Sequence, residues 1–453
     1  MTPRLLLTGT RSGCGKTTLT LALLRAWQRT GVDLSTCKCG PDYIDPLFHS
    51  SVLGVPGGNL DLFFTPPETV RALLHNHAAG KDLTVLEGAM GYYDGIALTS
   101  EASAWSMARA TETPAVLVLD ARGAAASLCA ELEGFLRYQS ESSIRGVLLN
   151  RVSPMLYPRL RAALEERCGV RVFGYLPPLL QCAIESRHLG LLTPGDVAQL
   201  WEKVDSLGEM ALKTVDLEGL MQLACSAPDL NAPRPSLPEG VEGAPTVAVA
   251  RDGAFCFYYR ENLALLRELG GKIVTFSPLR DKYLPPCDAL WLGGGYPELH
   301  TAALTENRAL RQQIRAAVVA GLPTIAECGG FLYLQRELEA LNGERGQGCG
   351  VFPGRAYPKG KLSRFGYVTL TARRDNLLCG AGERLRGHEF HYWDVDEPGS
   401  DFRAQKPQSE RGWDCVHAGP TLYAGFPHLY LYANPAAARR FLCAAVAYRK
   451  AKR

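Results

Sequence analysis

A glycine-rich loop between two apolar segments restricts the fold of this chain more than any other stretch. An apolar run at residues 5–7 ends at Thr8, and a second apolar segment starts at Leu19. Between them, residues 8–18 read Thr-Gly-Thr-Arg-Ser-Gly-Cys-Gly-Lys-Thr-Thr. A strand, a glycine loop and a helix in this order direct backbone N–H groups and the positive end of a helix dipole at one point, which suits a triphosphate. The sequence therefore predicts a nucleotide-binding P-loop.

Polar residues in this loop have distinct predicted roles. Lys16 would place a positive charge on the phosphates, and the hydroxyl of Thr17 would ligate Mg²⁺. The usual pattern has glycine five positions before Gly15, where this chain has Thr10. The strand-to-helix context still favours nucleotide binding over a glycine-rich turn without a ligand. The ATP-binding candidates are Arg11, Gly13, Gly15, Lys16, Thr17 and Thr18, with Arg11 contacting the chain's own ATP, a partner's ATP or only solvent.

Composition and length exclude several classes of protein. A chain of 453 residues predicts two or three domains, and a net charge of +3 implies no nucleic-acid partner. The absence of an apolar run of about 18 residues predicts a cytoplasmic protein without a membrane span. The 14 cysteines have no framework spacing, which favours reduced thiols. Cys37 and Cys39 are interpreted as buried thiols rather than as a metal or redox pair.

Acidic residues follow two further predicted strands. Residues 35–39 form a strand pattern, and residues 40–49, with two prolines and a glycine, are expected to form a rigid loop. Asp42 and Asp45 in this loop could hold Mg²⁺ or orient a reacting group, the alternative being an Asp-capped turn. Glu87 directly follows the buried-strand pattern at residues 83–86. P-loop proteins place the carboxylate that completes the Mg²⁺ shell at such a point, so Glu87 is the predicted ligand.

Strand and helix patterns alternate in both halves of the chain, which predicts an α/β protein with parallel, doubly wound sheets. The predicted strands include residues 5–7, 35–39, 83–86, 115–120, 146–150, 170–176, 246–250, 289–292 and 323–326. Prolines accumulate between residues 224 and 245, which indicates a linker. The predicted organisation is an ATP-binding domain at residues 1–226, a linker at residues 227–244 and a second domain at residues 245–453.

Cys328 stands at a predicted strand-to-helix turn, after the strand at residues 323–326. This is the geometry of a nucleophile elbow, in which the turn exposes the sulfur and neighbouring N–H groups hold an oxyanion. The helix N-terminus is expected to lower the pKa of the thiol. The Gly-Gly pair after Cys328 and the Gly-Gly-Gly loop at residues 293–295 favour this interpretation over a buried structural cysteine.

A cysteine nucleophile needs a histidine base, and His428, close to the end of the chain, is the best candidate in this half. His388 and His391 lack the spacing of a zinc-binding helix. On a strand they would face opposite sides, so we interpret them as substrate contact or structure.

Taken together, these motifs resemble the cobyrinate a,c-diamide synthase family over nearly the whole chain. Besides the P-loop, the resemblance rests on residues 38–46 (KCGPDYIDP), 87–91 (EGAMG), 94–95 (DG), 187–191 (RHLGL), 293–298 (GGGYPE), 326–330 (AECGG), 365–367 (FGY) and 387–392 (GHEFHY). Members of this family are ATP-dependent amidotransferases that convert two side-chain carboxylates of a corrinoid precursor of cobalamin to amides.

The resemblance implies that the second half is a class I glutamine amidotransferase domain with a flavodoxin-like fold. Cys328 would attack the glutamine amide to give a glutamyl thioester, and His428 would move protons. The implied oxyanion hole consists of backbone N–H groups of Gly294, Gly295 and Gly329. Class I enzymes usually carry a glutamate two residues after the histidine, where this chain has Tyr430.

For the first half, the resemblance implies a dethiobiotin synthetase-type P-loop domain that phosphorylates a carboxylate with ATP. Ammonia would then attack the acyl phosphate, which requires the two sites to face each other across a closed interface. The resemblance implies that Asp45 ligates Mg²⁺ together with Thr17 and Glu87. Its implied substrate or intermediate contacts are Asp42, Tyr43, Asp94 and His388, and a homodimer is compatible with it.

Three alternatives remain open from the sequence. Cobyric acid synthase and nickel-sirohydrochlorin a,c-diamide synthase use the same chemistry, and the segments at residues 41–46 and 87–91 argue against the first. A partition-type ATPase switch is the rival from another class, because its P-loop carries a signature lysine where this chain has Arg11. That alternative leaves the second half of the chain without an explanation.

Overall fold

The computed structural model describes residues 2–179, 182, 194–230 and 234–452. The chain divides into two compact units, an N-terminal unit, Met1–Pro235, and a C-terminal unit, Ser236–Arg453. Within the described ranges, no helix combines the length and the apolar content that a membrane crossing requires. The cysteines are all free thiols, which confirms the prediction of reduced cysteines.

The N-terminal unit is built on one seven-stranded sheet in the order β3-β2-β4-β1-β5-β6-β7. Its strands are β1 (Arg4–Gly9), β2 (Leu34–Cys39), β3 (Gly57–Leu60), β4 (Leu83–Glu87), β5 (Ala115–Asp120), β6 (Ile144–Asn150) and β7 (Arg171–Leu176). All of these pairings are parallel. Because β1 lies between β4 and β5, the loops that follow these strands meet at one edge, where open parallel sheets bind ligands.

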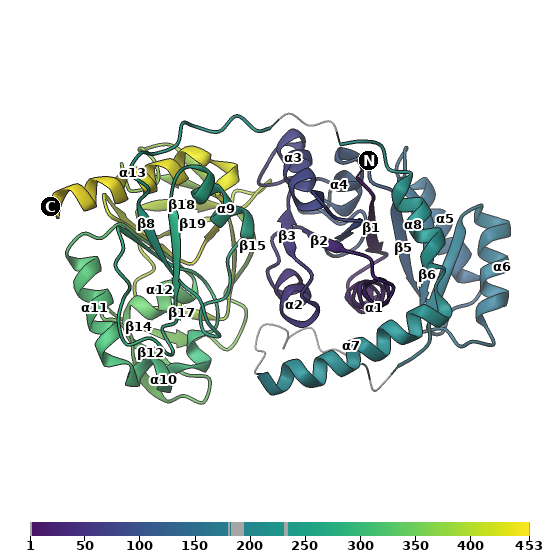
Figure 1. Cartoon of the computed structure of the whole chain (residues 1–453), viewed down its shortest axis with the longest axis horizontal. Helices are drawn as coiled ribbons and strands as arrows, with labels where there is room; N and C mark the ends of the chain where they lie inside the picture. Colours follow the sequence, from purple (N-terminus) through teal and green to yellow (C-terminus); the bar gives the residue numbers. More distant parts are fainter. Residues whose placement is uncertain (1, 180–181, 183–193, 231–233, 453) are drawn as a thin grey trace. The chain divides into compact units, whose positions relative to one another are not determined.

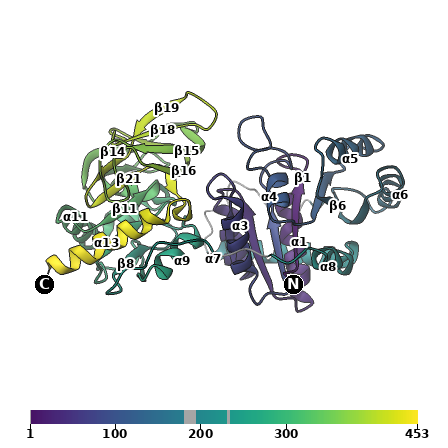
Figure 2. The ribbon, with the colours of Figure 1, turned by 90° about the horizontal axis from the view of Figure 1, so that it is seen from above.

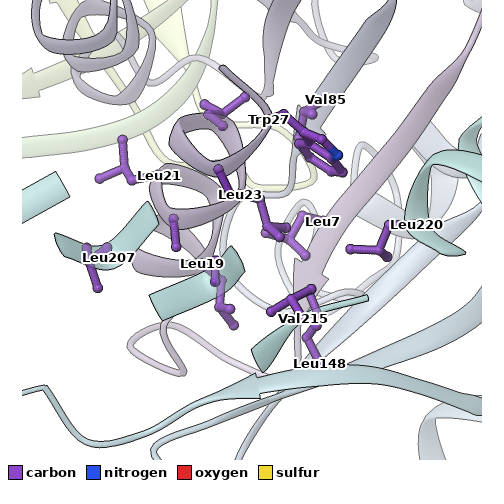
Figure 3. Packing of buried hydrophobic residues seen from close by; sticks show 14 of the residues in the cluster. Leu7, Leu19, Leu21, Leu23, Trp27, Val85, Leu148, Leu207, Val215 and Leu220 are labelled. Atoms are coloured by element: carbon purple, nitrogen blue, oxygen red, sulfur yellow. The ribbon is translucent and has the colours of Figure 1, made fainter. Parts of the chain in front are cut away.

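Helices lie on both sides of this sheet (Figure 1 and Figure 2). They are α1 (Lys16–Arg29), α2 (Ile44–Leu53), α3 (Pro67–Ala78), α4 (Ala104–Ala110), α5 (Ser127–Arg137), α6 (Tyr157–Cys168), α7 (Pro194–Thr214) and α8 (Leu217–Cys225). The apolar sides of α1, α2, α7 and α8 form one core with alternate strand residues. Figure 3 shows Leu19 and Leu23 of α1 packed with Leu7 of β1 and Leu148 of β6. This packing fixes the start of α1, and therefore the P-loop, relative to the sheet.

The C-terminal unit has a six-stranded sheet in the order β20-β21-β11-β10-β8-β9, with only β20 antiparallel to its neighbour. These strands are β8 (Thr246–Ala250), β9 (Lys272–Phe276), β10 (Ala289–Leu292), β11 (Thr324–Glu327), β20 (His417–Gly419) and β21 (Leu422–Gly425). The helical segments are α9 (Arg260–Glu268), η2 (Pro297–Leu299), α10 (Thr301–Glu306), α11 (Arg308–Val319), α12 (Gly329–Leu334), η3 (Leu431–Ala433) and α13 (Pro435–Ala451).

Two smaller sheets complete this unit. One contains β12 (Gln335–Glu339), β13 (Arg345–Gln347), β14 (Phe352–Pro358) and β17 (Trp393–Val395). The other contains β15 (Arg364–Ala372), β16 (Arg384–His391), β18 (Phe402–Gln405), β19 (Gly412–Cys415) and β22 (His428–Leu429). Figure 2 shows β15, β18 and β19 on the side of the unit away from β8 and α9. Sequence patterns did not predict these strands.

The observed architecture confirms the predicted α/β fold with parallel sheets in both halves. One local prediction was wrong, because residues 40–49 do not form a loop throughout. Helix α2 begins at Ile44, so Asp45 and Pro46 lie in its first turn. Proline is tolerated there because the first N–H groups of a helix have no partner within the helix.

Candidate active site

The loop between β1 and α1 has the backbone shape that its glycines predict. Gly15 precedes the first residue of α1, Lys16, and has a φ of 104°, which favours glycine. A Cβ atom on Gly15 would also lie 1.8 Å from Nδ2 of Asn150, at the end of β6. Asn150 Nδ2 donates to the Cys14 carbonyl over 2.9 Å, and Arg151 Nη2 donates to the Gly13 carbonyl over 2.7 Å. The end of β6 therefore holds the loop in place.

Lys16 and Thr17 lie at the start of α1, with Lys16 buried. Lys16 Nζ donates to the Arg11 carbonyl over 3.1 Å, so the ammonium is folded back over the loop. Burial lowers its pKa. Thr17 Oγ1 donates to Oε1 of Glu87 over 2.8 Å, which joins the P-loop to the end of β4. Thr18 lies next to Thr17 in the same turn of α1 and is partly exposed.

A buried cation joins the two predicted metal ligands. Lys38 of β2 donates to Oδ2 of Asp45 and, over 3.0 Å, to Oε1 of Glu87. Burial disfavours the ammonium, but the two carboxylates outweigh this effect and raise the pKa of Lys38. Burial also opposes ionisation of Glu87, yet Lys38 and the Thr17 hydrogen bond hold its pKa at about 2. Burial and the charge of Glu87 raise the pKa of Asp45 to about 7.

His49 completes this cluster from α2. Its Nε2 lies 3.5 Å from Oε2 of Glu87, and its Nδ1 lies 3.2 Å from the Thr36 hydroxyl. Burial lowers the pKa of His49 to about 4, so the ring is neutral at pH 7. The cluster of Lys38, Asp45, His49 and Glu87 is therefore held by hydrogen bonds and one internal cation.

The donor atoms at this edge fit Mg²⁺. Thr17 offers a hydroxyl oxygen, and Asp45 and Glu87 offer carboxylate oxygens, which are the ligand types that Mg²⁺ prefers. Each carboxylate has about four lone-pair positions, so Lys38 and a metal ion can share the same groups. In the described part of the chain, no group of three or more His, Cys, Asp or Glu side chains is arranged to hold a metal. Mg²⁺ would therefore depend on Thr17 and on nucleotide phosphates for its other ligands.

Replacing Lys38 by methionine is expected to lower the free energy of unfolding of the N-terminal unit by about 3–5 kcal/mol. Without the ammonium, two buried carboxylates have no compensating charge. Urea titration followed by tryptophan fluorescence would measure the loss. Glu87→Gln added to Lys38→Met should recover part of it, because it removes one of the uncompensated charges. A Lys38→Met variant as stable as the parent chain would contradict this account.

The other candidates in the N-terminal unit occupy loops around this edge. Asp42 Oδ1 accepts the Ile44 N–H over 2.9 Å, so Asp42 makes the capping turn that was the alternative to a metal ligand. Tyr43 is buried beside it. Asp94 is exposed, and its Oδ2 accepts the Gly91 N–H over 2.8 Å. Arg11 is also exposed, with its guanidinium 3.4 Å from Glu131.

Cys328 connects β11 to α12 in the C-terminal unit with the predicted elbow geometry. Its φ of 46° and ψ of −104° are strained for a residue other than glycine. A Cβ atom on Gly330 would lie 2.1 Å from the Leu292 carbonyl oxygen, so only glycine allows this close approach of α12 to β10. The Cys328 N–H donates to the Gly425 carbonyl over 2.8 Å, which ties the elbow to β21.

The predicted lowering of the Cys328 pKa is wrong. Burial raises the pKa of this thiol, and the charge of Glu298 raises it further. A hydrogen bond from the Gly329 N–H opposes the rise only in part. Residue patterns indicated a helix N-terminus but could not show that the side chain is 7% exposed. The thiol is therefore protonated at neutral pH and needs a base.

His428 and the glycine loop lie beside this elbow. Two residues separate the end of β21 from β22, which begins at His428, and this histidine is buried. A Cβ atom on Gly294 would lie 2.3 Å from Cε1 of His428, so the glycine loop and the imidazole are in contact. A Cβ atom on Gly329 would lie 2.9 Å from the backbone nitrogen of Gly295. The structure thus brings Cys328, His428 and the three predicted oxyanion glycines together at the ends of β10, β11 and β21.

Glu327 supplies an acid behind His428. Its Oε1 accepts the Leu429 N–H over 3.0 Å, and its Oε2 lies 3.9 Å from Nδ1 of His428. Glu327 is 2% exposed, so this carboxylate and the imidazole are shielded from water. Tyr430 is buried and packs edge-on against Tyr259 at a centroid distance of 5.0 Å. A carboxylate therefore lies near His428, although position 430 carries none.

Comparison with known proteins places this geometry in a family. Residues 5–189 match the CobQ/CobB/MinD/ParA nucleotide binding domain, and residues 246–434 match the CobB/CobQ-like glutamine amidotransferase domain. A cobyrinate a,c-diamide synthase from Caldanaerobacter subterraneus subsp. tengcongensis is 37% identical over 441 residues, which cover 96% of this chain and 97% of the relative. The chain belongs to the cobyrinate a,c-diamide synthase family.

A second curated relative agrees with this assignment. A cobyrinate a,c-diamide synthase from Salmonella typhimurium is 38% identical over 451 residues, which cover 97% of each chain. The solved structure of chloroplast FtsY from Physcomitrella patens matches 45% of this chain and 65% of its own at 14% identity. The TM-score of this match is 0.31.

The sequence analysis assigned no role to Lys38, His49 or Glu327. The structure places Lys38 and His49 against Glu87, and Glu327 near His428. Lys38 and Glu327 lie inside motifs that carried the resemblance, so the signal was a charged residue on a strand that is otherwise buried.

His388 pairs with His428 in the register of β16 and β22, and burial lowers its pKa to about 3. It therefore lies in the C-terminal unit beside the predicted base. The motif at residues 187–191 lies outside the described residues.

Proposed function

We propose that the chain catalyses ATP- and glutamine-dependent amidation of the a and c side-chain carboxylates of cobyrinate or hydrogenobyrinate, in cobalamin biosynthesis. The observation that carries this proposal is the match of 96% of the chain to a cobyrinate a,c-diamide synthase. The buried elbow at Cys328 and the P-loop cluster support it, because they provide one site for each half of the reaction.

In the N-terminal unit, the substrate carboxylate attacks the γ-phosphorus of ATP, giving an acyl phosphate and ADP. Activation is needed because hydroxide leaves a carboxyl group poorly, whereas phosphate leaves easily. Lys16 and the N–H groups of residues 13–18 bind the phosphates and stabilise the charge that moves to ADP. Thr17, Asp45 and Glu87 would hold Mg²⁺, which supplies further positive charge. Ammonia then displaces phosphate to give the amide.

In the C-terminal unit, His428 accepts the proton of the Cys328 thiol as the sulfur attacks the side-chain carbonyl of glutamine. Backbone N–H groups of Gly294, Gly295 and Gly329 would stabilise the oxyanion. His428 returns the proton to the leaving nitrogen, and ammonia departs as the glutamyl thioester forms. Water then hydrolyses the thioester, releases glutamate and restores the thiol.

Glu327 acts in this scheme as a positioning residue for His428. We expect Glu327→Gln to lower kcat for hydrolysis of the substrate glutamine by about 10²-fold or more, while KM stays nearly constant. The substituted side chain can still accept the hydrogen bond from the Leu429 N–H, but it lacks the charge that stabilises the imidazolium. Ammonia release assays would measure both constants. Glu337→Gln, on β12, is a matched control. An unchanged kcat in Glu327→Gln would remove Glu327 from this role.

The choice of tetrapyrrole is tested by offering the purified protein cobyrinate, hydrogenobyrinate and nickel-sirohydrochlorin in turn. With ATP and glutamine present, mass spectrometry should detect a diamide of cobyrinate or hydrogenobyrinate. One ADP should form for each amide. A diamide formed only from nickel-sirohydrochlorin would assign the chain to that synthase. A substrate that already carries the a and c amides and is amidated further would indicate cobyric acid synthase. A rate of ATP hydrolysis that changes with neither corrinoid nor glutamine would favour a partition-type ATPase switch.

We also propose that the enzyme is cytoplasmic and that it forms a homodimer without a nucleic-acid partner. Light scattering after gel filtration tests the oligomeric state directly.

A further inference from the structure

The glutaminase site contains a buried carboxylate that the proposed reaction does not use. Glu298 lies in η2, just after the glycine loop at residues 293–295, and is 7% exposed. Its Oε2 atom is buried and has no hydrogen-bond partner within the ranges that the structure describes. Burying a polar oxygen without a hydrogen-bond partner costs free energy of folding, so the position of Glu298 needs an explanation.

Glu298 lies in a turn that contacts the Cys328 elbow. A Cβ atom on Gly329 would lie 3.0 Å from Cδ of Pro297, so the turn that carries Glu298 contacts the residue after Cys328. Of the charged side chains, Glu298 has the largest influence on the pKa of the Cys328 thiol. It also raises the pKa of Cys256, whose N–H donates to the Gly294 carbonyl over 3.0 Å. The turn that carries Glu298 therefore contacts the elbow, and its charge acts on thiols on both sides of the oxyanion loop.

Two other acids around the elbow, Glu327 and Asp252, have hydrogen-bond partners. Glu327 is held by the Leu429 N–H and lies near His428. Asp252 accepts the Ala254 N–H and the Ser277 hydroxyl. Glu389 differs from Glu298 in having two cations nearby: burial raises its pKa to about 7, and the charges of Arg364 and Lys406 oppose this rise. Among the described residues, no cation pairs with Glu298, and burial raises its pKa to about 8.

We propose that Glu298 binds the α-ammonium group of glutamine while Cys328 attacks the side-chain amide. This inference rests on the proposed function, because it requires glutamine to be the substrate of this unit. Glutamine carries its ammonium group on Cα and its reacting amide at the end of the side chain. A buried carboxylate beside the nucleophile forms a strong, charge-assisted hydrogen bond with that ammonium. The ammonium also favours the ionised form of Glu298, whose pKa is about 8 without a partner. An analogue without the amine gains neither this pairing nor the hydrogen bond, so the site selects against it.

The test compares glutamine with glutaramate, which has the same amide and carboxylate but no α-amine. Ammonia release should show that the unmodified protein prefers glutamine by about 10²-fold or more in kcat/KM. In Glu298→Gln the preference should fall to within about tenfold, chiefly through a higher KM for glutamine. Glu298→Met, which has a similar volume and no charge, should behave in the same way. Glu306→Gln, exposed on α10, is the matched control and should keep the original preference.

Three results would overturn the inference. The first is an unchanged preference for glutamine in both Glu298 variants. The second is a collapse of kcat at constant KM, which would assign Glu298 to the chemistry of the thiol. The third is an equal loss of synthesis from ammonium salts, which would assign it to folding. Failure of the unmodified protein to hydrolyse glutamine at all would instead refute the proposed function.

Discussion

Cys328→Ala should abolish glutamine-dependent synthesis while synthesis from ammonium salts continues. Removal of the sulfur prevents the thioester, and loss of a nucleophile of this kind costs on the order of 10⁴-fold or more in rate. Added ammonia bypasses the C-terminal unit, because the acyl phosphate forms in the N-terminal unit. Amide formation would be followed by mass spectrometry with each nitrogen source in parallel.

The design separates a chemical effect from a structural one. Cys443→Ala, on α13, removes a partly buried thiol from the same unit and should leave both reactions intact. Burial raises the pKa of Cys328, so iodoacetamide should react slowly with the free protein. Loss of synthesis from both glutamine and ammonium in Cys328→Ala would contradict the division of labour between the two units.

Glu87→Gln should impair synthesis from glutamine and from ammonium equally, by about 10²-fold or more. The carboxylate is the shared acceptor of Thr17 and Lys38, and its negative charge lies where a cation at the P-loop would bind. Removing a group that stabilises the charge developing in phosphoryl transfer has effects of this size. ADP formation in the presence of corrinoid and ammonium measures the step without any contribution from the glutaminase.

A control for this variant is Glu68→Gln, an exposed acid at the start of α3. The Mg²⁺ concentration that gives half-maximal ADP formation should also rise in Glu87→Gln, because a neutral amide is a weaker ligand. An unchanged rate and an unchanged Mg²⁺ requirement would exclude Glu87 from both roles.

The sequence predicted those parts of the site that depend on local pattern. The P-loop and the elbow at Cys328 are each encoded within about a dozen consecutive residues, as strand, glycines and helix. The start of α2 was missed because Pro41 and Pro46 suggested a loop, although a proline in the first turn is compatible with a helix. Roles for Asp42, Asp94 and Arg11 in binding remain predictions.

Features that depend on distant contacts could not be predicted. Lys38 and Glu87 are 49 residues apart, and Glu327 and Leu429 are 102 apart, so no sequence window contains either pair. The pKa of Cys328 depends on burial by several segments and on Glu298, which lies in another loop. These contacts become visible only once the strand order is known.

Lys38 changes what the N-terminal site must do between turnovers. Two carboxylates that faced each other alone in a buried pocket would repel and tend to separate or take up a proton. With Lys38 bonded to both, the resting enzyme carries its own counter-ion, and the end of β4 stays joined to α2. An arriving cation then shares an assembled set of oxygens, so little reorganisation separates the empty site from the loaded one.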